Sequence, residues 1–165
     1  MRRTWSPRGV TPVIRHHFNW TRLHCIVTID CAPDGTDADV LCYMQPKSID
    51  SISIIEFLHT LHSEIAGPIV LLWDGLAAHH SKIVREHIDA CKDWLSVERF
   101  PAYAPELNPV EYLLSAVKGK DVANLCATSI GHIAYRLEDA VSRFADNPGI
   151  IQGFLRASKL FNDTG

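Results

Sequence analysis

Residues 69–74 read IVLLWD, five apolar residues that run directly into an aspartate. A continuous apolar run of this length, placed after the Gly-Pro pair at 67–68, predicts a short β-strand covered on both faces. In open α/β sheets, ligands bind outside the carboxyl ends of the strands. Asp74 is therefore the first candidate site residue, and an aspartate that only caps the turn after the strand is the alternative.

The segments around this strand give a mixed α/β pattern. Runs rich in Val, Ile and Thr at 13–18 and 23–29, followed by the Asp-Gly pair at 34–35 and a third run at 39–43, predict strands and a hairpin. Apolar residues three or four apart predict a helix over 50–66. Beyond residue 74 we expect a helix over 81–94, a strand over 95–100, a proline-rich loop over 101–109, a helix over 108–118, and further helices. One domain spanning 1–165, with a basic arm at 1–12 and C-terminal helices at 119–165, is the simplest organisation.

The composition fits a folded domain with an uneven charge distribution. The 165 residues are 47% hydrophobic with a formal charge of −3, which excludes a histone-like binder and an acidic disordered tail. Residues 1–29 carry five arginines and no acid, whereas residues 30–118 carry 14 acids and 6 bases. A basic arm beside an acidic centre suits a protein that grips a polyanion near metal-binding carboxylates. A solvated arginine-rich loop is the competing interpretation.

The cysteines and the apolar segments indicate the compartment. The five cysteines are widely spaced and form no C-x-x-C pair, so we expect reduced packing residues and neither a disulfide framework nor a zinc site. No apolar stretch is long enough for a signal peptide or a membrane span. We therefore expect a cytoplasmic protein that touches no membrane, associated with the nucleoid if it binds DNA.

Glu111 is the second candidate acid. It follows Asp74 by 37 positions, and the helix, strand and loop predicted between them return the chain to the mouth of the same sheet. Two carboxylates there could hold one hard divalent cation through oxygen. The alternative is structural, because Asn108 as N-cap, Pro109 at N1 and Glu111 at N3 also make a capping arrangement.

Three stretches carry a family resemblance. Residues 2–9 read RRTWSPRG, residues 73–79 read WDGLAAH, and residues 101–111 read PAYAPELNPVE. Together they resemble the mariner-like insertion-sequence transposases of the DDE superfamily, over about residues 2–118. In that family a strand ends in Asp-Asn-x-x-x-His, and a P-x-Y-S-P-E-L-N-P-I-E segment delivers the last catalytic acid. This chain departs from the pattern at Gly75, Ala104 and Leu114, where Asn, Ser and Trp are usual.

The resemblance implies an RNase H-like mixed sheet flanked by helices and a DNA transposition activity. It implies that hydrolysis at a transposon end frees a 3′-hydroxyl that attacks target DNA, with Mg²⁺, or Mn²⁺ as substitute, as the cofactor. Asp74 and Glu111 would be the catalytic metal ligands. The implied partners are transposon-end and target DNA, together with a second copy or a full-length transposase. The residues implied to contact DNA are Arg2, Arg3, Arg8, His79 and Lys118.

The resemblance also implies that the first catalytic strand, with its Asp, is missing from these 165 residues. Asp30 ends a strand-like run, and turn chemistry with Asp34 explains it better than metal ligation does. His59 and His62 lie three apart on a predicted helix, and a surface pair explains them better than a metal site. We expect the chain alone to bind Mg²⁺ weakly and to cleave DNA poorly or not at all. The alternatives are an inactive remnant that only binds DNA or an intact partner, and an unrelated α/β hydrolase or ligand-binding domain.

Overall fold

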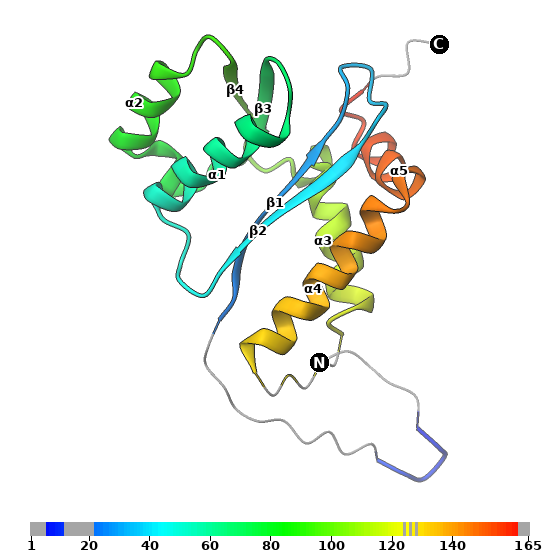
Figure 1. Ribbon diagram of the computed structural model, residues 1–165. Coiled ribbons are helices and arrows are strands. Elements are labelled where there is room, and N and C mark those ends of the chain that lie inside the picture. Colours follow the sequence, from blue (N-terminus) through cyan, green and yellow to red (C-terminus); the bar gives the residue numbers. More distant parts are fainter. Residues whose placement is uncertain (1–5, 12–21, 124, 126, 128, 162–165) are drawn as a thin grey trace.

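The computed structural model describes residues 6–11, 22–123, 125, 127 and 129–161. Arg2, Arg3 and the strand expected over 13–18 lie outside these residues. The described chain is mixed α/β, as expected (Figure 1). None of its helices combines the length and the apolar character that crossing a membrane requires.

The expected hairpin is present, formed by β1 (His24–Asp30) and β2 (Asp39–Gln45). The two strands are antiparallel, with His24 opposite Gln45 and Asp30 opposite Asp39. Gly35 lies in the turn with φ 80°, a left-handed conformation that glycine adopts without steric cost. Asp34 Oδ1 accepts hydrogen bonds from the backbone N–H and the hydroxyl of Thr36, so Asp34 carries the turn chemistry.

A β-α-β unit follows the hairpin. Helix α1 (Ser51–Glu64) leads to β3 (Ile69–Trp73), a short 3₁₀ turn η1 (Ala77–His80), α2 (Lys82–Ala90) and β4 (Leu95–Arg99). Strands β3 and β4 are parallel, as a connection through a helix allows. Helix α2 ends at Ala90, four residues earlier than expected. Its last turn is replaced by tight turns in which the amides of Trp94 and Leu95 donate to the Cys91 carbonyl.

Helical capping follows the sequence closely. Asp50 caps α1 by accepting from the Ser53 N–H at 2.9 Å, and the Ser81 hydroxyl caps α2. After a short 3₁₀ turn η2 (Pro105–Leu107), Asn108 caps α3 (Pro109–Lys120) with Pro109 in its first turn. The C-terminal helices are α4 (Ile130–Ala145) and α5 (Pro148–Ser158). Pro148 begins α5, so the Asn-Pro-Gly break is the start of that helix.

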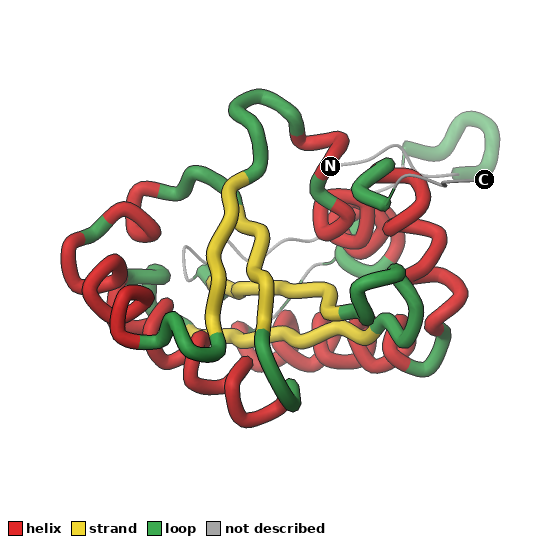
Figure 2. Tube along the Cα trace, turned by 90° about the horizontal axis from the view of Figure 1, so that it is seen from above, coloured by secondary structure: helices red, strands yellow, loops and turns green. Residues whose placement is uncertain are grey.

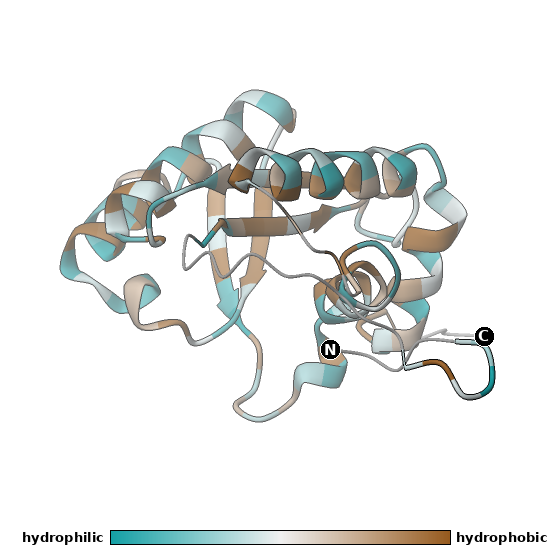
Figure 3. Cartoon of the chain, turned by 90° about the horizontal axis from the view of Figure 1, so that it is seen from below, coloured by the Kyte–Doolittle hydropathy of each residue, from teal (hydrophilic) through white to brown (hydrophobic). Residues whose placement is uncertain are grey.

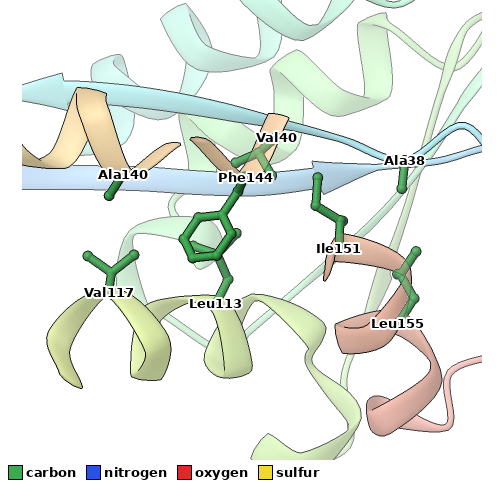
Figure 4. Packing of buried hydrophobic residues seen from close by; sticks show 8 residues of the cluster. All are labelled: Ala38, Val40, Leu113, Val117, Ala140, Phe144, Ile151 and Leu155. Carbon is green, nitrogen blue, oxygen red and sulfur yellow. The ribbon is translucent and has the colours of Figure 1, made fainter. Parts of the chain in front are cut away.

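Two hydrophobic clusters hold these elements. In the first, side chains of α3, α4 and α5 converge on β2 and the residue before it (Figure 4). In the second, α1 and α2 pack on β3 and β4. Figure 3 shows the hydrophobic colour concentrated on the strands, whereas the helices alternate between hydrophilic and hydrophobic. The members of the first cluster are Ala38, Val40, Leu113, Val117, Ala140, Phe144, Ile151 and Leu155.

Two features of the sheet differ from expectation. The described strands form two separate two-stranded sheets, β1–β2 and β3–β4, in place of one mixed sheet (Figure 2). Strand β3 is covered on one face only: Ile69 and Leu71 are buried, but Val70 is 65% exposed and Leu72 is 37% exposed. A continuous apolar run predicts burial on both faces, but the described residues cover the second face only in part.

Candidate active site

A cavity of about 590 Å³ lies beside β3 and is lined in part by the candidate acids. Asp74, directly after β3, and Glu111, in the first turn of α3, both line it. The connection through α2, β4 and the proline-rich loop therefore returns the second acid to the lining of the same cavity. Asp30, at the end of β1, and His79, in η1, line the same cavity.

Asp74 is held in place but remains open to solvent. Its side chain is 66% exposed. The carboxylate Oδ1 accepts the backbone N–H of Leu76 at 3.0 Å and lies 3.3 Å from His79 Nδ1. Within the described chain this carboxylate makes its contacts through Oδ1, and Oδ2 has no hydrogen bond or ion pair there. A carboxylate fixed through one oxygen and free at the other suits metal or proton binding.

His79 contacts both the side chain and the backbone of Asp74. Its side chain is only 14% exposed, and Nδ1 also lies 3.0 Å from the Asp74 backbone carbonyl oxygen. The imidazole stacks on the Trp73 indole with ring centroids 4.1 Å apart and planes 4° apart. This stack fixes the imidazole, and the imidazole in turn fixes the Asp74 backbone and carboxylate. The Trp73 contact was missed from the sequence; a tryptophan directly before the acid was its only signal.

Glu111 does not form the capping box that the sequence allows. A capping box needs the Glu carboxylate to accept the Asn108 backbone N–H. Here that N–H donates to the Pro105 carbonyl at 3.1 Å, while Asn108 Oδ1 accepts the Val110 N–H at 3.1 Å. Glu111 is exposed, and among the described residues its carboxylate has no hydrogen bond or ion pair. The cap on α3 is therefore Asn108, and the Glu111 carboxylate is left for another partner.

Asp30 also reaches the cavity. Burial is the main cause that raises the pKa of this carboxyl above its ordinary value, and the negative charge of Asp39 adds to the effect. Its Oδ1 is buried without a hydrogen-bond partner in the described chain. The side chain therefore takes no part in the hairpin turn, in contrast to Asp34.

The remaining candidates lie elsewhere. Arg8 is exposed in a turn closed by the Val10 N–H on the Pro7 carbonyl, and it does not line the cavity. Lys118 is exposed and lies seven residues after Glu111 on α3, hence on the same side of that helix, but outside the cavity lining. His59 and His62 are exposed and make ring contacts with His87 and Trp94 respectively. No three His, Cys, Asp or Glu side chains of the described chain are grouped closely enough to hold a metal ion.

The donor atoms of the site suit the metal that the resemblance implies. Asp74 and Glu111 offer carboxylate oxygens, the ligands that Mg²⁺ prefers, and Mg²⁺ is commonly held by one or two carboxylates plus waters and substrate phosphates. The chemistry of the site therefore fits Mg²⁺ or Mn²⁺. Because no three such side chains are grouped in the described part of the chain, waters and substrate phosphates would have to complete the coordination of the ion.

The chain is similar to known proteins both in sequence profile and in fold. Residues 1–125 match the profile of a family described as DDE superfamily endonuclease. Among solved structures, the chain is similar to the Mos1 mariner paired end complex with Mn, with a TM-score of 0.64 and 16% identity over 97% of this chain and 47% of that one. The Mos1 strand transfer complex gives a TM-score of 0.63 at 16% identity over 96% of this chain and 46% of that one.

The catalytic domain of Mos1 mariner transposase alone gives a TM-score of 0.56 at 17% identity, over 84% of this chain and 76% of that one. This likeness confirms the expected fold class, that of a mariner transposase catalytic domain. The chain spans about half the length of the Mos1 chains in the paired end and strand transfer complexes. No curated protein matches the chain.

Proposed function

The chain belongs to the DDE superfamily endonuclease family, and from this premise we propose that it carries the catalytic site of a mariner-like transposase. The reaction is metal-dependent cleavage of DNA phosphodiester bonds at transposon ends, followed by strand transfer. The observation that carries the proposal is the shared cavity of Asp74 and Glu111, two exposed carboxylates 37 residues apart in sequence. Its substrate is DNA, in keeping with the Mos1 complexes that resemble it in fold.

Each residue of the site has a defined part in this proposal. Asp74 offers Oδ2 to a divalent ion while the Leu76 N–H and His79 hold Oδ1. Glu111 offers its unpaired carboxylate from the first turn of α3. A bound Mg²⁺ would neutralise charge that develops on the phosphate and lower the pKa of an attacking water. Arg8 and Lys118, which are not part of the cavity lining, are proposed to contact DNA phosphates together with Arg2 and Arg3.

His79 has a positioning role in the same proposal. Stacked on Trp73 and 3.3 Å from Asp74 Oδ1, it keeps the carboxylate directed at the cavity. Because the ring is nearly buried, a phosphate contact by His79 would need DNA to approach the cavity mouth closely. Replacing His79 should therefore weaken metal binding more than DNA binding.

A plasmid-nicking assay tests the function. Supercoiled DNA is incubated with the chain in Mg²⁺ or Mn²⁺, and we expect slow nicking at most, lost in Asp74→Asn and in Glu111→Gln. Glu106→Gln is the matched control, because Glu106 is an exposed acid just before α3 that does not line the cavity. Nicking that persists in both site variants, or in excess chelator, would remove these residues from the proposal.

A second function is favoured by the absence of a three-ligand metal group in the described residues. In that case the chain binds DNA, or an intact transposase, and does not cleave. DNA binding by mobility shift at low salt, with no nicking in either metal and no metal-dependent difference between wild type and Asp74→Asn, identifies this function. Rapid nicking that Asp74→Ala abolishes would exclude it.

A further inference from the structure

Three sulfur-bearing side chains share one face of the β1–β2 hairpin. In the register of the two strands, Cys25 lies opposite Met44, and Val27 lies opposite Cys42. Residues two apart along a strand lie on the same face of a sheet, and directly opposite residues of an antiparallel pair share that face as well. Cys25, Cys42 and Met44 therefore belong to the same face, at the end of the hairpin away from its turn.

This face of the hairpin is the one that α3 and α4 cover. Val27 and Val40, which lie on the same face by alternation, pack in the cluster that these helices form with α5. Figure 4 shows Val40 among the side chains of α3 and α4. Cys42 and Met44 are half-buried, whereas Cys25 is exposed. The three sulfur side chains therefore lie at the margin of the cluster, open to solvent at Cys25.

The two thiols lie close enough to affect each other's charge. Burial raises the pKa of Cys42 to about 12, and the negative charges of Cys25 and Glu138 add to the effect. Burial also raises the pKa of Cys25, whereas the ammonium group of Lys118 lowers it. Two neighbouring thiolates in this half-buried place are unfavourable by themselves, and a cation held between them would remove that cost.

The spacing of the two thiols suits a metal bridge better than a disulfide. Cys25 and Cys42, both free thiols, are diagonal neighbours across the hairpin, and such residues lie about 7–8 Å apart. A disulfide needs Cα atoms about 4.4–6.8 Å apart, so forming one would require the strands to shift. Two metal–sulfur bonds of about 2.3 Å each lengthen the link enough to join the thiolates through one ion.

We propose that Cys25, Cys42 and Met44 bind one copper(I) ion through their three sulfur atoms. The thioether selects the metal, because zinc is bound by Cys, His and carboxylate ligands, whereas soft sets of thiolate and thioether select copper(I). Binding releases the two thiol protons to solvent, transfers no electron, and leaves one net negative charge that the Lys118 ammonium offsets. The site uses none of the carboxylates of the candidate active site and goes beyond the proposed function.

Anaerobic titration of the reduced chain with copper(I) tests the site. Bicinchoninate, a chelator that is coloured when it holds copper(I), competes for the ion, so its loss of colour measures stoichiometry and affinity. We expect one ion per chain, with three sulfur neighbours in X-ray absorption. Cys25→Ser, Cys42→Ser and Met44→Leu should each weaken binding about tenfold or more, because even groups that only orient a metal ligand change affinity by about 10–100-fold.

Two other cysteines provide matched controls. Cys31→Ser and Cys91→Ser remove half-buried free thiols outside the trio and should leave copper(I) affinity unchanged. Circular dichroism checks that each variant folds. Should Cys42→Ser fail to fold, Cys25→Ser at an exposed position and Met44→Leu still decide the question. Copper(I) affinity that a control variant lowers as much as Cys25→Ser does, affinity that Met44→Leu leaves unchanged, or zinc bound more tightly than copper(I) overturns the three-sulfur site.

Discussion

Apolar and acidic side chains are buried in the α3–α5 layer but exposed in the cavity beside β3. In the layer, Leu113 is 1% exposed, and the Asp121 side chain, 5% exposed, is paired with Arg143 at 2.7 Å. In the cavity lining, Val70 is 65% exposed, and the Asp74 side chain is 66% exposed with no hydrogen bond to Oδ2 within the described chain. In the layer, apolar and acidic side chains therefore contribute to the stability of the fold. In the cavity they remain available to a ligand, so substitutions in the two regions should change the free energy of unfolding by different amounts.

The largest contrast is expected for apolar truncations. Leu113→Ala should lower the free energy of unfolding by about 3 kcal/mol, because it removes a fully buried side chain and leaves a cavity. Val70→Ala should lower it by less than about 0.5 kcal/mol, because Val70 is mostly exposed. Urea unfolding of both variants measures the difference. Similar losses would mean that the cavity beside β3 is closed in solution.

The acids should differ next. Asp121→Asn removes the charge that pairs with Arg143 and should cost about 2 kcal/mol, less than a fully buried pair because Arg143 is 41% exposed. Asp74→Asn should leave the free energy of unfolding unchanged, since its carboxylate is exposed. Thermal unfolding at pH 7 compares the two variants. A clear loss in Asp74→Asn would make Asp74 a structural residue.

A smaller effect separates the two roles weighed for Glu111. Asn108→Ala should cost about 1 kcal/mol, because Asn108 Oδ1 caps α3. Glu111→Gln should cost nothing measurable, since its carboxylate makes no capping bond. Unfolding curves of the two variants, together with Mn²⁺ affinity, decide between cap and ligand. Lower stability with unchanged metal affinity in Glu111→Gln would favour the capping role.

The smallest effect concerns the cap on α1 and depends on pH. Hydrogen bonds from the Ser53 backbone N–H and hydroxyl hold the pKa of Asp50 below its ordinary value. The stabilisation is present above the unfolded pKa of about 3.9 and is lost as the pH falls through the lower folded value. Wild type should therefore melt above Asp50→Ala at pH 6, and the gap should narrow progressively as the pH falls below about 4. A gap that persists at pH 2 would rule out the charged cap.

The sequence predicted those features that are determined by residues close together along the chain. The hairpin turn at Gly35, the caps Asp50, Ser81 and Asn108, and the strand at 69–73 all follow from local backbone and side-chain chemistry. The open face of β3 could not be predicted. An apolar run indicates that a strand is stable when both faces are covered, but it does not indicate which elements cover them. For the same reason the sequence did not predict the shape of the cavity beside β3.

The sequence identified individual residues of the candidate site, but it did not predict the contacts that they make. Asp74 and Glu111 were identified from strand and helix positions, and both line one cavity. The stack of His79 on Trp73 depends on how η1 folds back over the strand end, which spacing alone does not determine. The burial of Asp30 depends on the helices packed over β1, so its place in the cavity was equally hidden.

The central claim is that Asp74 and Glu111 share one divalent ion. Calorimetric titration with Mn²⁺ tests it directly on wild type, Asp74→Asn, Glu111→Gln, the double variant and the Glu106→Gln control. A shared ion predicts that each single variant loses most of the binding, that the double variant loses little more, and that the control is unchanged. Losses that simply add, or Mn²⁺ affinity that survives either single substitution, would contradict a shared site.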